Sequence, residues 1–259
     1  MDSETLHAFI NELIDISIEV IMPYWASDDL AVDRKKDNTV VTEADRGAEA
    51  AMRKRISERF PDHGVIGEEY GTDRADAEYV WVLDPIDGTI SFTHRIPLFG
   101  TLIALKHQGQ PILGAISQPV LGERLVGDGS TTTLNGKPVR VTETGDLANA
   151  TVLTTDTRRA ARLQPDTHWD RIAEASQVYR TWGDAYGYLM VGTGRADAMV
   201  DPIANEWDFI GHIPIIRGAG GIITDWAGNA PVDADGKVAE SVVAANAALH
   251  PRIMQMLHG

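Results

Sequence analysis

The residues with the clearest chemical potential lie in segment 84–89, with the sequence DPIDGT, directly after a run of five apolar residues. That run is rich in β-branched and aromatic residues, which predicts a buried strand. Asp84 and Asp87 would then stand in a tight turn at the strand's end, where two carboxylates can converge on a hard cation. Gly88 allows close approach of the backbone to a ligand, and Thr89 can cap a following helix whose free N–H groups suit a phosphate. We therefore expect this turn to hold metal ions and the anion on which they act, although Asp-x-x-Asp alone is typical of an ordinary acidic loop.

Two further acidic segments strengthen this prediction. Segment 67–69, GEE, follows the short apolar pair 65–66, which predicts a second strand with acidic residues at its end. The dipeptide 207–208, WD, precedes the apolar stretch 209–216, and the glycine-rich segment 218–221 follows. Hydrolysis of a phosphate monoester by two divalent ions needs several carboxylates from different parts of the chain. The three acidic segments supply such a set.

Together these segments resemble the motifs of the inositol monophosphatase superfamily: GEE at 67–69, WVLDPIDGT at 81–89, and WD at 207–208 with the glycines of 218–221. They occur in the family's order and spacing, and the resemblance covers nearly the whole chain. It implies a magnesium-dependent, lithium-sensitive phosphomonoesterase that hydrolyses a small-molecule phosphate ester. It also implies an α/β (α+β) fold, the layered α–β–α–β–α sandwich of this superfamily, and a homodimer.

The resemblance carries a metal-ligand set onto this sequence. It implies that Glu68, Asp84 and the carbonyl of Ile86 bind one Mg²⁺, and that Asp84, Asp87 and Asp208 bind a second. A third, loosely held ion is expected near Glu68, and Mn²⁺ is an expected substitute for Mg²⁺. The expected cofactor is therefore two to three divalent ions.

The resemblance also assigns catalytic and phosphate-binding roles. Gly88 and Thr89 would offer N–H groups to the phosphate, and Thr89 with Asp45 would polarise the attacking water beside the metal ligand Glu68. Glu69 would support the site or bind a water. Lys36, in a charged loop, would lie near the site.

Asp45 has a local interpretation as well. Segment 42–45, TEAD, predicts a capping arrangement for a helix that runs to about Phe60, before Pro61. A carboxylate in the first turn is favoured by the helix dipole, so Asp45 could serve the helix alone. The family pattern Val-Thr-x-x-Asp matches segment 41–45 and favours a role in catalysis.

Substrate choice is expected to depend on Gly183, Asp184 and Asp201, which the resemblance places around the leaving group. Segments 97–105, 131–136 and 182–188 look more like the histidinol-phosphate phosphatase branch than like a typical inositol phosphatase. Histidinol carries an amine and an imidazole, so acidic residues near the leaving group would suit it, whereas inositol is neutral. The expected substrate is therefore L-histidinol phosphate, an intermediate of histidine biosynthesis.

Several alternatives stay open at this point. Asp184 could be a helix cap, and Asp201, before Pro202, could be a turn residue. Inositol 1-phosphate and sugar or nucleotide phosphates are the alternative substrates, although no extra basic cluster for a second phosphate is evident. A non-catalytic regulator that kept the fold is a further alternative of another class.

Composition limits the partners. The 259 residues carry a net charge of -15, which argues against nucleic acid or an anionic membrane as partner. A phosphate would be repelled too, unless bound cations reverse the local charge. Cysteine is absent, which excludes disulfides, thiolate metal sites and cysteine nucleophiles. The start MDSE lacks the features of a signal peptide and no apolar run spans a membrane, so the cytoplasm is the expected location.

Apolar periodicity divides the chain into two parts. Residues 1–145 are expected to form a helix pair on an antiparallel sheet, with a first helix capped by Ser3 and ending near Pro23. Residues 146–259 alternate between strands and helices, which predicts an α/β half. The expected strands and helices, besides those above, are strands 98–105, 112–117, 124–126, 139–141, 151–155, 177–181, 198–200, 221–224 and 241–245, and helices 168–176, 184–193, 209–217 and 251–257.

Overall fold

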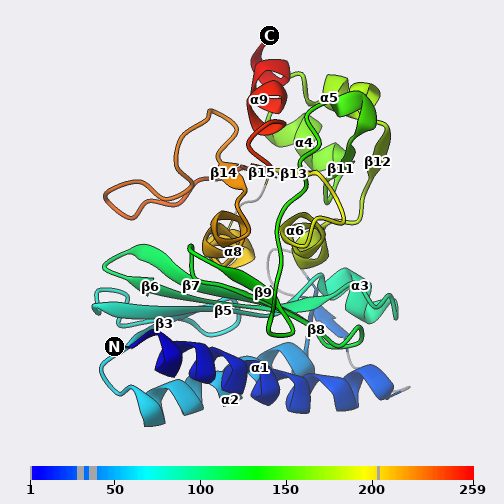
Figure 1. Cartoon of the computed structure of the whole chain (residues 1–259). Helices are drawn as coiled ribbons and strands as arrows, with labels where there is room; N and C mark the ends of the chain where they lie inside the picture. The colour runs from blue at the N-terminus through cyan, green and yellow to red at the C-terminus, as the bar shows by residue number, and fades with distance from the viewer. Residues whose placement is uncertain (1, 28–31, 35–39, 203–204) are drawn as a thin grey trace.

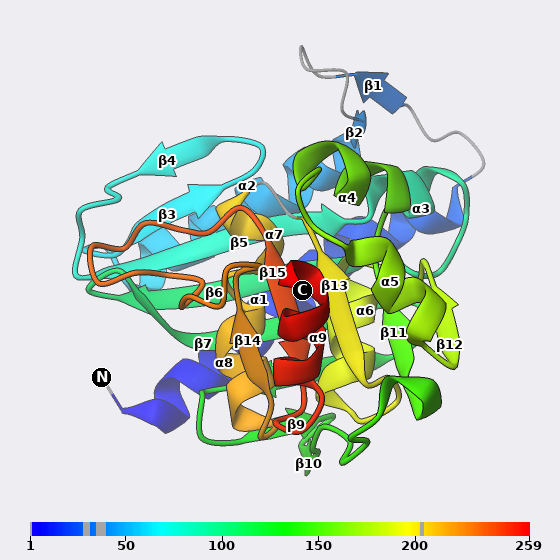
Figure 2. The ribbon, with the colours of Figure 1, turned by 90° about the horizontal axis from the view of Figure 1, so that it is seen from above.

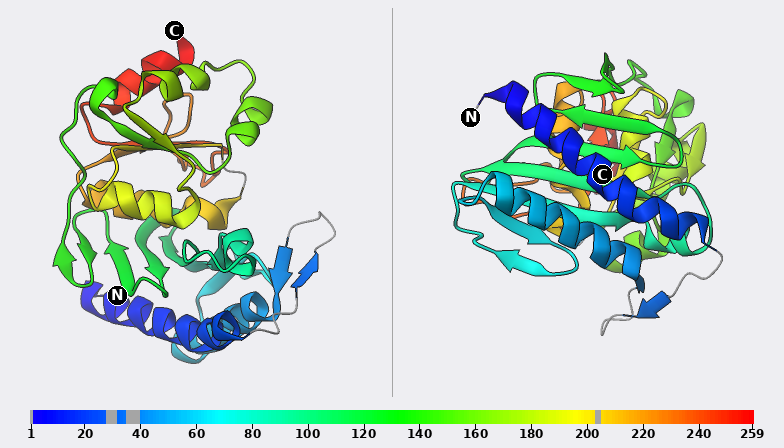
Figure 3. Two further views of the ribbon diagram at one scale, coloured as in Figure 1. Left: turned by 90° about the vertical axis from the view of Figure 1, so that its right-hand side faces the viewer. Right: turned by 90° about the horizontal axis from the view of Figure 1, so that it is seen from below.

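The computed structural model describes residues 2–27, 32–34, 40–202 and 205–259. The elements stack in five layers that alternate between helices and sheets (Figure 1). Two helices cover the outer face of a large sheet, a middle pair lies between the two sheets, and further helices cover the outer face of a smaller sheet (Figure 3). The predicted α–β–α–β–α sandwich is confirmed.

The outer helix pair consists of α1, Ser3–Ala26, and α2, Glu43–Arg59. The side chain of Asp2, not of Ser3, caps α1 by accepting the N–H of Thr5 at 2.8 Å. The helix also continues through Pro23, beyond the predicted end. A proline inside a helix loses one hydrogen bond. Here the last turn is held by Trp25, whose ring lies 4.9 Å from that of Phe99.

The prediction for α2 is confirmed in detail. Thr42 is its N-cap, and the side chains of Thr42 and Asp45 form a reciprocal capping box. The helix ends at Arg59, one residue before the predicted Phe60. Figure 3 shows α1 and α2 lying across the large sheet when the molecule is seen from below.

Within the described residues, the large sheet has eight strands in the order β10-β9-β8-β7-β6-β5-β3-β4. It is not purely antiparallel as expected, because β3 and β5 pair in parallel. The edge strand β4 runs antiparallel to β3, so the chain then enters β5 in the direction of β3. The strands are β3 Gly64–Gly67, β4 Gly71–Asp73, β5 Tyr79–Asp87, β6 Gly100–His107, β7 Gln110–Gln118, β8 Glu123–Gly127, β9 Thr132–Leu134 and β10 Lys137–Pro138. A separate pair, β1 Val32–Arg34 and β2 Val40–Thr42, precedes α2 (Figure 2).

The strand predicted at 139–141 is wrong. The chain turns at Asn135-Gly136 between β9 and β10, with positive φ at both residues. The N–H of Val141 then binds the carbonyl of Ala219 at 3.0 Å. The chain has left the large sheet here, because it passes to the second half of the fold.

The smaller sheet has the order β12-β11-β13-β15-β14 within the described part of the chain. Strands β12, β11 and β13 are parallel, whereas β15 pairs antiparallel with both β13 and β14. The bounds are β11 Thr151–Leu153, β12 Val178–Arg180, β13 Ala198–Asp201, β14 Ile222–Thr224 and β15 Val242–Ala245.

The helices of the second half include two departures from prediction. Helix α4 was not expected, and the single helix predicted at 209–217 is split into α7 and α8. The split has a steric cause: a Cβ on Gly114 of β7 would lie 1.9 Å from the carbonyl oxygen of Gly211, so the backbone between the two helices presses against the large sheet. The helices are η1 Leu147–Asn149, α4 Thr157–Leu163, α5 Trp169–Ala175, α6 Asp184–Gly192, α7 Glu206–Phe209, α8 His212–Gly218 and α9 His250–His258.

Apolar side chains fill the spaces between the layers. One buried cluster lies between α1, α2 and the large sheet, and another packs α5 and α9 onto the smaller sheet. The cluster around α6 and α8 includes residues of both sheets. The predicted domain boundary at 145/146 falls just before η1. One apolar cluster contains residues from both sides of it, so the division into two domains stays a prediction.

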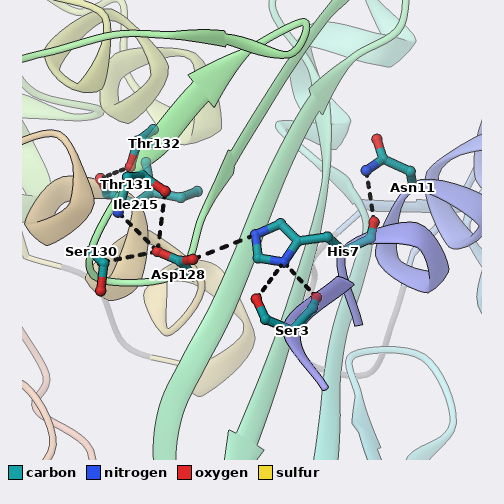
Figure 4. Close-up of polar contacts among 8 residues, drawn as sticks. All are labelled: Ser3, His7, Asn11, Asp128, Ser130, Thr131, Thr132 and Ile215. Carbon is teal, nitrogen blue, oxygen red and sulfur yellow. Dashed lines mark hydrogen bonds and ion pairs between the residues drawn. The ribbon is translucent and has the colours of Figure 1, made fainter. Parts of the chain in front are cut away.

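Polar contacts fasten the first turns of α1 to the loop after β8 (Figure 4). The His7 ring lies 3.7 Å from the Asp128 carboxylate, which also accepts the N–H groups of Ser130 and Thr131 at 2.9 and 2.8 Å. In the part of the chain that the structure describes, no helix is long and apolar enough to cross a membrane.

Candidate active site

The end of β5 and the start of α3, Thr89–Thr93, form the centre of the predicted site. Gly88, with a φ of 82°, is the N-cap of α3, so the expectation that Thr89 caps this helix is wrong. Thr89 is instead the first helical residue, and its hydroxyl donates to the carbonyl of Ile86 at 3.0 Å. The ladder between β5 and β6 is irregular between Asp84 and Asp87. Because of this irregularity, the carboxylates of Asp84 and Asp87 both project from the end of β5.

Asp84, Asp87 and Asp208 lie close enough to one another and to Glu68 for their negative charges to interact, and Arg159 is a cation whose charge opposes that of Asp208. Asp84 is 2% exposed, and its Oδ1 has no hydrogen-bond partner among them. Burial raises the pKa of Asp84 well above its usual range, and the charges of Glu68, Asp87 and Asp208 raise it further. Burial followed by neighbouring acids also raises the pKa of Asp87, and burial and Glu68 raise that of Asp208 to about 7.

This donor set fits a hard divalent cation. All the side-chain donors are carboxylate oxygens, which Mg²⁺ and Mn²⁺ prefer, and a bound cation would offset their repulsion. In the described residues no three His, Asp or Glu side chains already form a finished ligand group. The ligand assignment therefore remains a proposal.

Asp45 approaches this acidic group from the start of α2. Its Oδ2 accepts the N–H of Thr42 at 2.8 Å, whereas its buried Oδ1 has no partner among the described residues. Burial raises the pKa of Asp45 to about 6. The capping interpretation is confirmed, and one carboxylate oxygen is still left over for another role.

Glu68 and Glu69 follow β3, as predicted. The N–H of Glu68 donates to the carbonyl of Leu83 at 3.2 Å, which ties this turn to β5. The N–H of Glu69 donates to Glu49 at 2.8 Å, and Glu49 is also paired with Arg53 at 2.7 Å. Sequence reasoning missed Glu49, although its position four residues before Arg53 on α2 was a usable signal.

The start of α6 lies directly against the turn after β5. The N–H of Ala185 donates to the carboxylate of Asp87. A Cβ on Gly88 would lie 3.2 Å from Oδ2 of Asp184, so these two residues are in contact. Gly183 is the N-cap of α6, and the alternative that Asp184 caps the helix is wrong. Burial raises the pKa of Asp184 to about 6.

Asp201 ends β13 and is fully buried beside the same place. It accepts a hydrogen bond from the N–H of Thr155 at 3.2 Å and another from the Thr155 hydroxyl. The same hydroxyl accepts the N–H of Asp184 at 2.9 Å. Burial raises the pKa of Asp201 to about 7. Thr155 thus joins the two acids that are predicted to contact the substrate, and only its place at the end of a predicted strand could have indicated this.

The remaining predicted residues are placed as follows. Asp208 lies in α7 and accepts a hydrogen bond from the Asn205 amide at 3.1 Å. Lys36 lies outside the described residues. Two surface cavities, of about 640 and 330 Å³, contain none of the predicted site residues.

The five-layer fold and the acid-rich junction between its sheets define a class of layered metal-dependent phosphatases. The family model of the inositol monophosphatase family matches residues 2–259. The chain belongs to this family, whose members are phosphoric monoester hydrolases that depend on metal ions, generally Mg²⁺.

Individual relatives agree with the family. A histidinol-phosphatase of Chlorobaculum parvum is 39% identical over 92% of this chain and 91% of its own length. A chloroplastic bifunctional phosphatase of Arabidopsis thaliana is 41% identical over 84% of this chain and 63% of its own length. The structure of an inositol monophosphatase from Zymomonas mobilis superposes with a TM-score of 0.86 at 34% identity, covering 99% and 98% of the two chains.

Proposed function

We propose that this enzyme hydrolyses L-histidinol phosphate to L-histidinol and phosphate, a step of histidine biosynthesis. The observation that carries the proposal is the pair of acids formed by the half-buried Asp184 and the buried Asp201, which Thr155 joins beside Gly88. Histidinol is a cationic leaving group, and two acids held at this place would bind its amine or imidazole. The similarity to a histidinol-phosphatase supports this choice.

The metal ligands are proposed from the family's ligand pattern, carried onto the residues of this chain. Glu68, Asp84 and the Ile86 carbonyl would hold one Mg²⁺, and Asp84, Asp87 and Asp208 a second, with Mn²⁺ as substitute. When bound, such ions activate a water and neutralise the phosphoryl oxygens. We propose two to three ions, the third near Glu68. The support is the raised pKa of three of these acids and the unpartnered Oδ1 of Asp84.

The chain's own residues would do the following. Gly88 and Thr89 present the first N–H groups of α3, which have no acceptor within the helix and face the phosphate. Asp45 accepts a proton from the attacking water through its free Oδ1, and the Thr89 hydroxyl orients this water beside Glu68. Glu69 fixes the turn through its N–H bond to Glu49.

Kinetics on two substrates test the proposal directly. Histidinol phosphate should show a kcat/KM at least tenfold above that of inositol 1-phosphate, since a charge-assisted contact is worth about 1.5–3 kcal/mol. Asp201→Asn should weaken hydrolysis of histidinol phosphate much more than hydrolysis of an ester with a neutral leaving group. Equal losses on both esters would mean that Asp201 stabilises the fold and does not bind the leaving group of the substrate.

Inositol 1-phosphate is the second candidate substrate. The similarity to the inositol monophosphatase of Zymomonas mobilis favours it. A higher specificity constant for the inositol ester would replace the first proposal and leave the phosphatase assignment intact. Sugar and nucleotide phosphates belong in the same panel. A protein that binds Mg²⁺ but hydrolyses none of these esters would be a non-catalytic regulator.

Three further properties stay predictions: a homodimer, a cytoplasmic location and inhibition by lithium. Light scattering at micromolar concentration tests the dimer, and a monomer mass would contradict it. Activity measured against increasing lithium at saturating Mg²⁺ tests the inhibition.

A further inference from the structure

Tyr188, in the second turn of α6, is fully buried between the two sheets. Its hydroxyl has no hydrogen-bond partner among the described residues. Buried hydroxyl groups in proteins are nearly always hydrogen-bonded, to protein or to ordered water. The Tyr188 hydroxyl therefore points to a partner that is not one of these protein groups.

The ring of Tyr188 stacks on His212, with 4.0 Å between centroids and 19° between planes. His212 is the first residue of α8, one helical turn after Asp208. Burial lowers the pKa of His212 to about 3, so the imidazole is neutral, and both of its nitrogens lack a partner among the described residues. The stacked pair therefore joins α6 to the start of α8, which follows the helix that carries Asp208, and Figure 1 shows α6 and α8 side by side between the two sheets.

Helix α6, which carries Tyr188, also contacts Asp87. Ala185, one turn before Tyr188 on α6, donates its N–H to the Asp87 carboxylate. The buried amide of Gln118 also lacks a partner among the described residues. A Cβ on Gly100 would lie 2.7 Å from Nε2 of Gln118 and 3.3 Å from Cβ of Ala185, so this amide lies beside the start of α6.

The acids near Tyr188 indicate which hydrogen-bond partner its hydroxyl can have. After burial, the negative charges of Asp201, Asp87, Asp208 and Asp184, in this order, raise the pKa of Tyr188. A tyrosine hydroxyl is protonated at neutral pH and can donate a hydrogen bond toward a carboxylate. A buried water needs two to four polar partners, and hydroxyl, imidazole and carboxylates together provide them.

We propose that Tyr188 is a positioning residue for the metal site: its hydroxyl donates, through a buried water, to the carboxylates around α6, and its ring holds Asp208 in register with Asp87. This inference rests on the metal ligands of the proposed function. Groups that orient metal ligands typically change metal affinity 10- to 100-fold when they are removed.

The test is Tyr188→Phe, which keeps the stacked ring and removes only the hydroxyl. Mg²⁺ binding is measured by titration calorimetry without substrate. The variant should bind Mg²⁺ about tenfold more weakly, at the low end of that range because a water intervenes. Tyr186→Phe on the same helix is the matched control, and its Mg²⁺ affinity should equal that of the unchanged protein.

Two results would overturn the inference, and they are distinguishable. Unchanged Mg²⁺ affinity with a higher melting temperature in Tyr188→Phe would show that the hydroxyl is simply unpaired and destabilising. It would leave the proposed function intact. Failure of the unchanged protein to bind Mg²⁺ at all would remove the proposed metal site and the inference with it.

Discussion

Asp87 contacts both halves of the molecule. It ends β5 in the large sheet, and its carboxylate accepts the N–H of Ala185 at the start of α6. Asp87 is half-buried, and the neighbouring charges that raise its pKa are those of Asp184, Asp208 and Glu68. The negative charges of the neighbouring acids raise one another's pKa values, as expected for carboxylates that share a cation.

Replacing Asp87 by Asn tests its role as a metal ligand. The change is nearly isosteric and removes one negative charge, so turnover should fall at least about 100-fold, which corresponds to roughly 3 kcal/mol of transition-state stabilisation. The measurement is hydrolysis of a generic phosphomonoester at saturating Mg²⁺. The exposed Asp166→Asn serves as control and should keep full activity. Near-normal turnover of Asp87→Asn would remove it from the ligand set.

The raised pKa values also predict how pH affects stability. Asp45 and Asp184 titrate at about 6, and Asp201 and Asp208 at about 7, above the value of 3.8 for a free carboxyl. Between pH 4 and 7 the folded protein therefore binds more protons than the unfolded chain, and the metal-free protein loses stability as pH rises.

Mg²⁺ should reverse this trend, because it binds the deprotonated acids. The stabilisation by Mg²⁺ should grow from pH 5 to pH 8 and reach about 2.7 kcal/mol at 100 times its Kd. Thermal melts at each pH, with Mg²⁺ and with a chelator, measure both effects. Metal-free stability that rises steadily from pH 4 to 7 would contradict the assignment of buried, uncompensated acids.

At the scale of elements, the junction between β5, α3 and α6 depends on backbone geometry. Gly88 combines a positive φ with a close approach of Asp184 and of the Leu98 carbonyl, at 3.2 and 3.3 Å from where a Cβ would lie. A side chain there would strain the backbone and also push α6 away from α3. Gly122, with a φ of 65° and nothing within 4 Å, has only the first problem.

This difference provides a matched pair of variants. Gly122→Ala should lower the free energy of unfolding by about 1 kcal/mol because it needs a left-handed backbone, and Gly88→Ala should lower it by more because its Cβ also meets Asp184 and the Leu98 carbonyl. Only Gly88→Ala should also lose more than about tenfold in kcat/KM, since it displaces the acids. Urea unfolding and steady-state kinetics measure the two quantities. Equal activity in both variants would mean that the contact between Gly88 and Asp184 is not needed for catalysis.

At the scale of the whole molecule, the two sheets are joined by a common interior. The apolar cluster around α6 and α8 includes Val82 and Ile116 of the large sheet and Met199 and Ala244 of the smaller one. The candidate active site lies along this same junction. Separation of the halves would expose the core and dismantle the site together.

We therefore expect a single unfolding transition. Far-UV circular dichroism and tryptophan fluorescence should give the same midpoint in urea, since neither half retains a complete core alone. Trp81 reports on the large sheet and Trp226 on the smaller one, and both are buried. Two separated transitions would support independent domains at 1–145 and 146–259.

The sequence by itself predicted the acidic segments, the buried strand β5, the capped helix α2 and, through the family resemblance, the order of layers. These features depend on residues close together in the chain, where periodicity, capping and turn chemistry act directly. The same local rules predicted most of the remaining strands, with errors of a few residues at their ends.

Only the tertiary structure decided how the site is assembled. Asp87 and Ala185 are 98 positions apart, and Thr155 meets Asp201 across 46. Such contacts depend on how whole layers pack, and no local pattern contains them. The parallel pairing of β3 with β5 and the break between α7 and α8 arise in the same way, because chain direction and backbone contact with another layer determine them. The sequence thus specified which groups can do chemistry, and the packing of the layers brought them together.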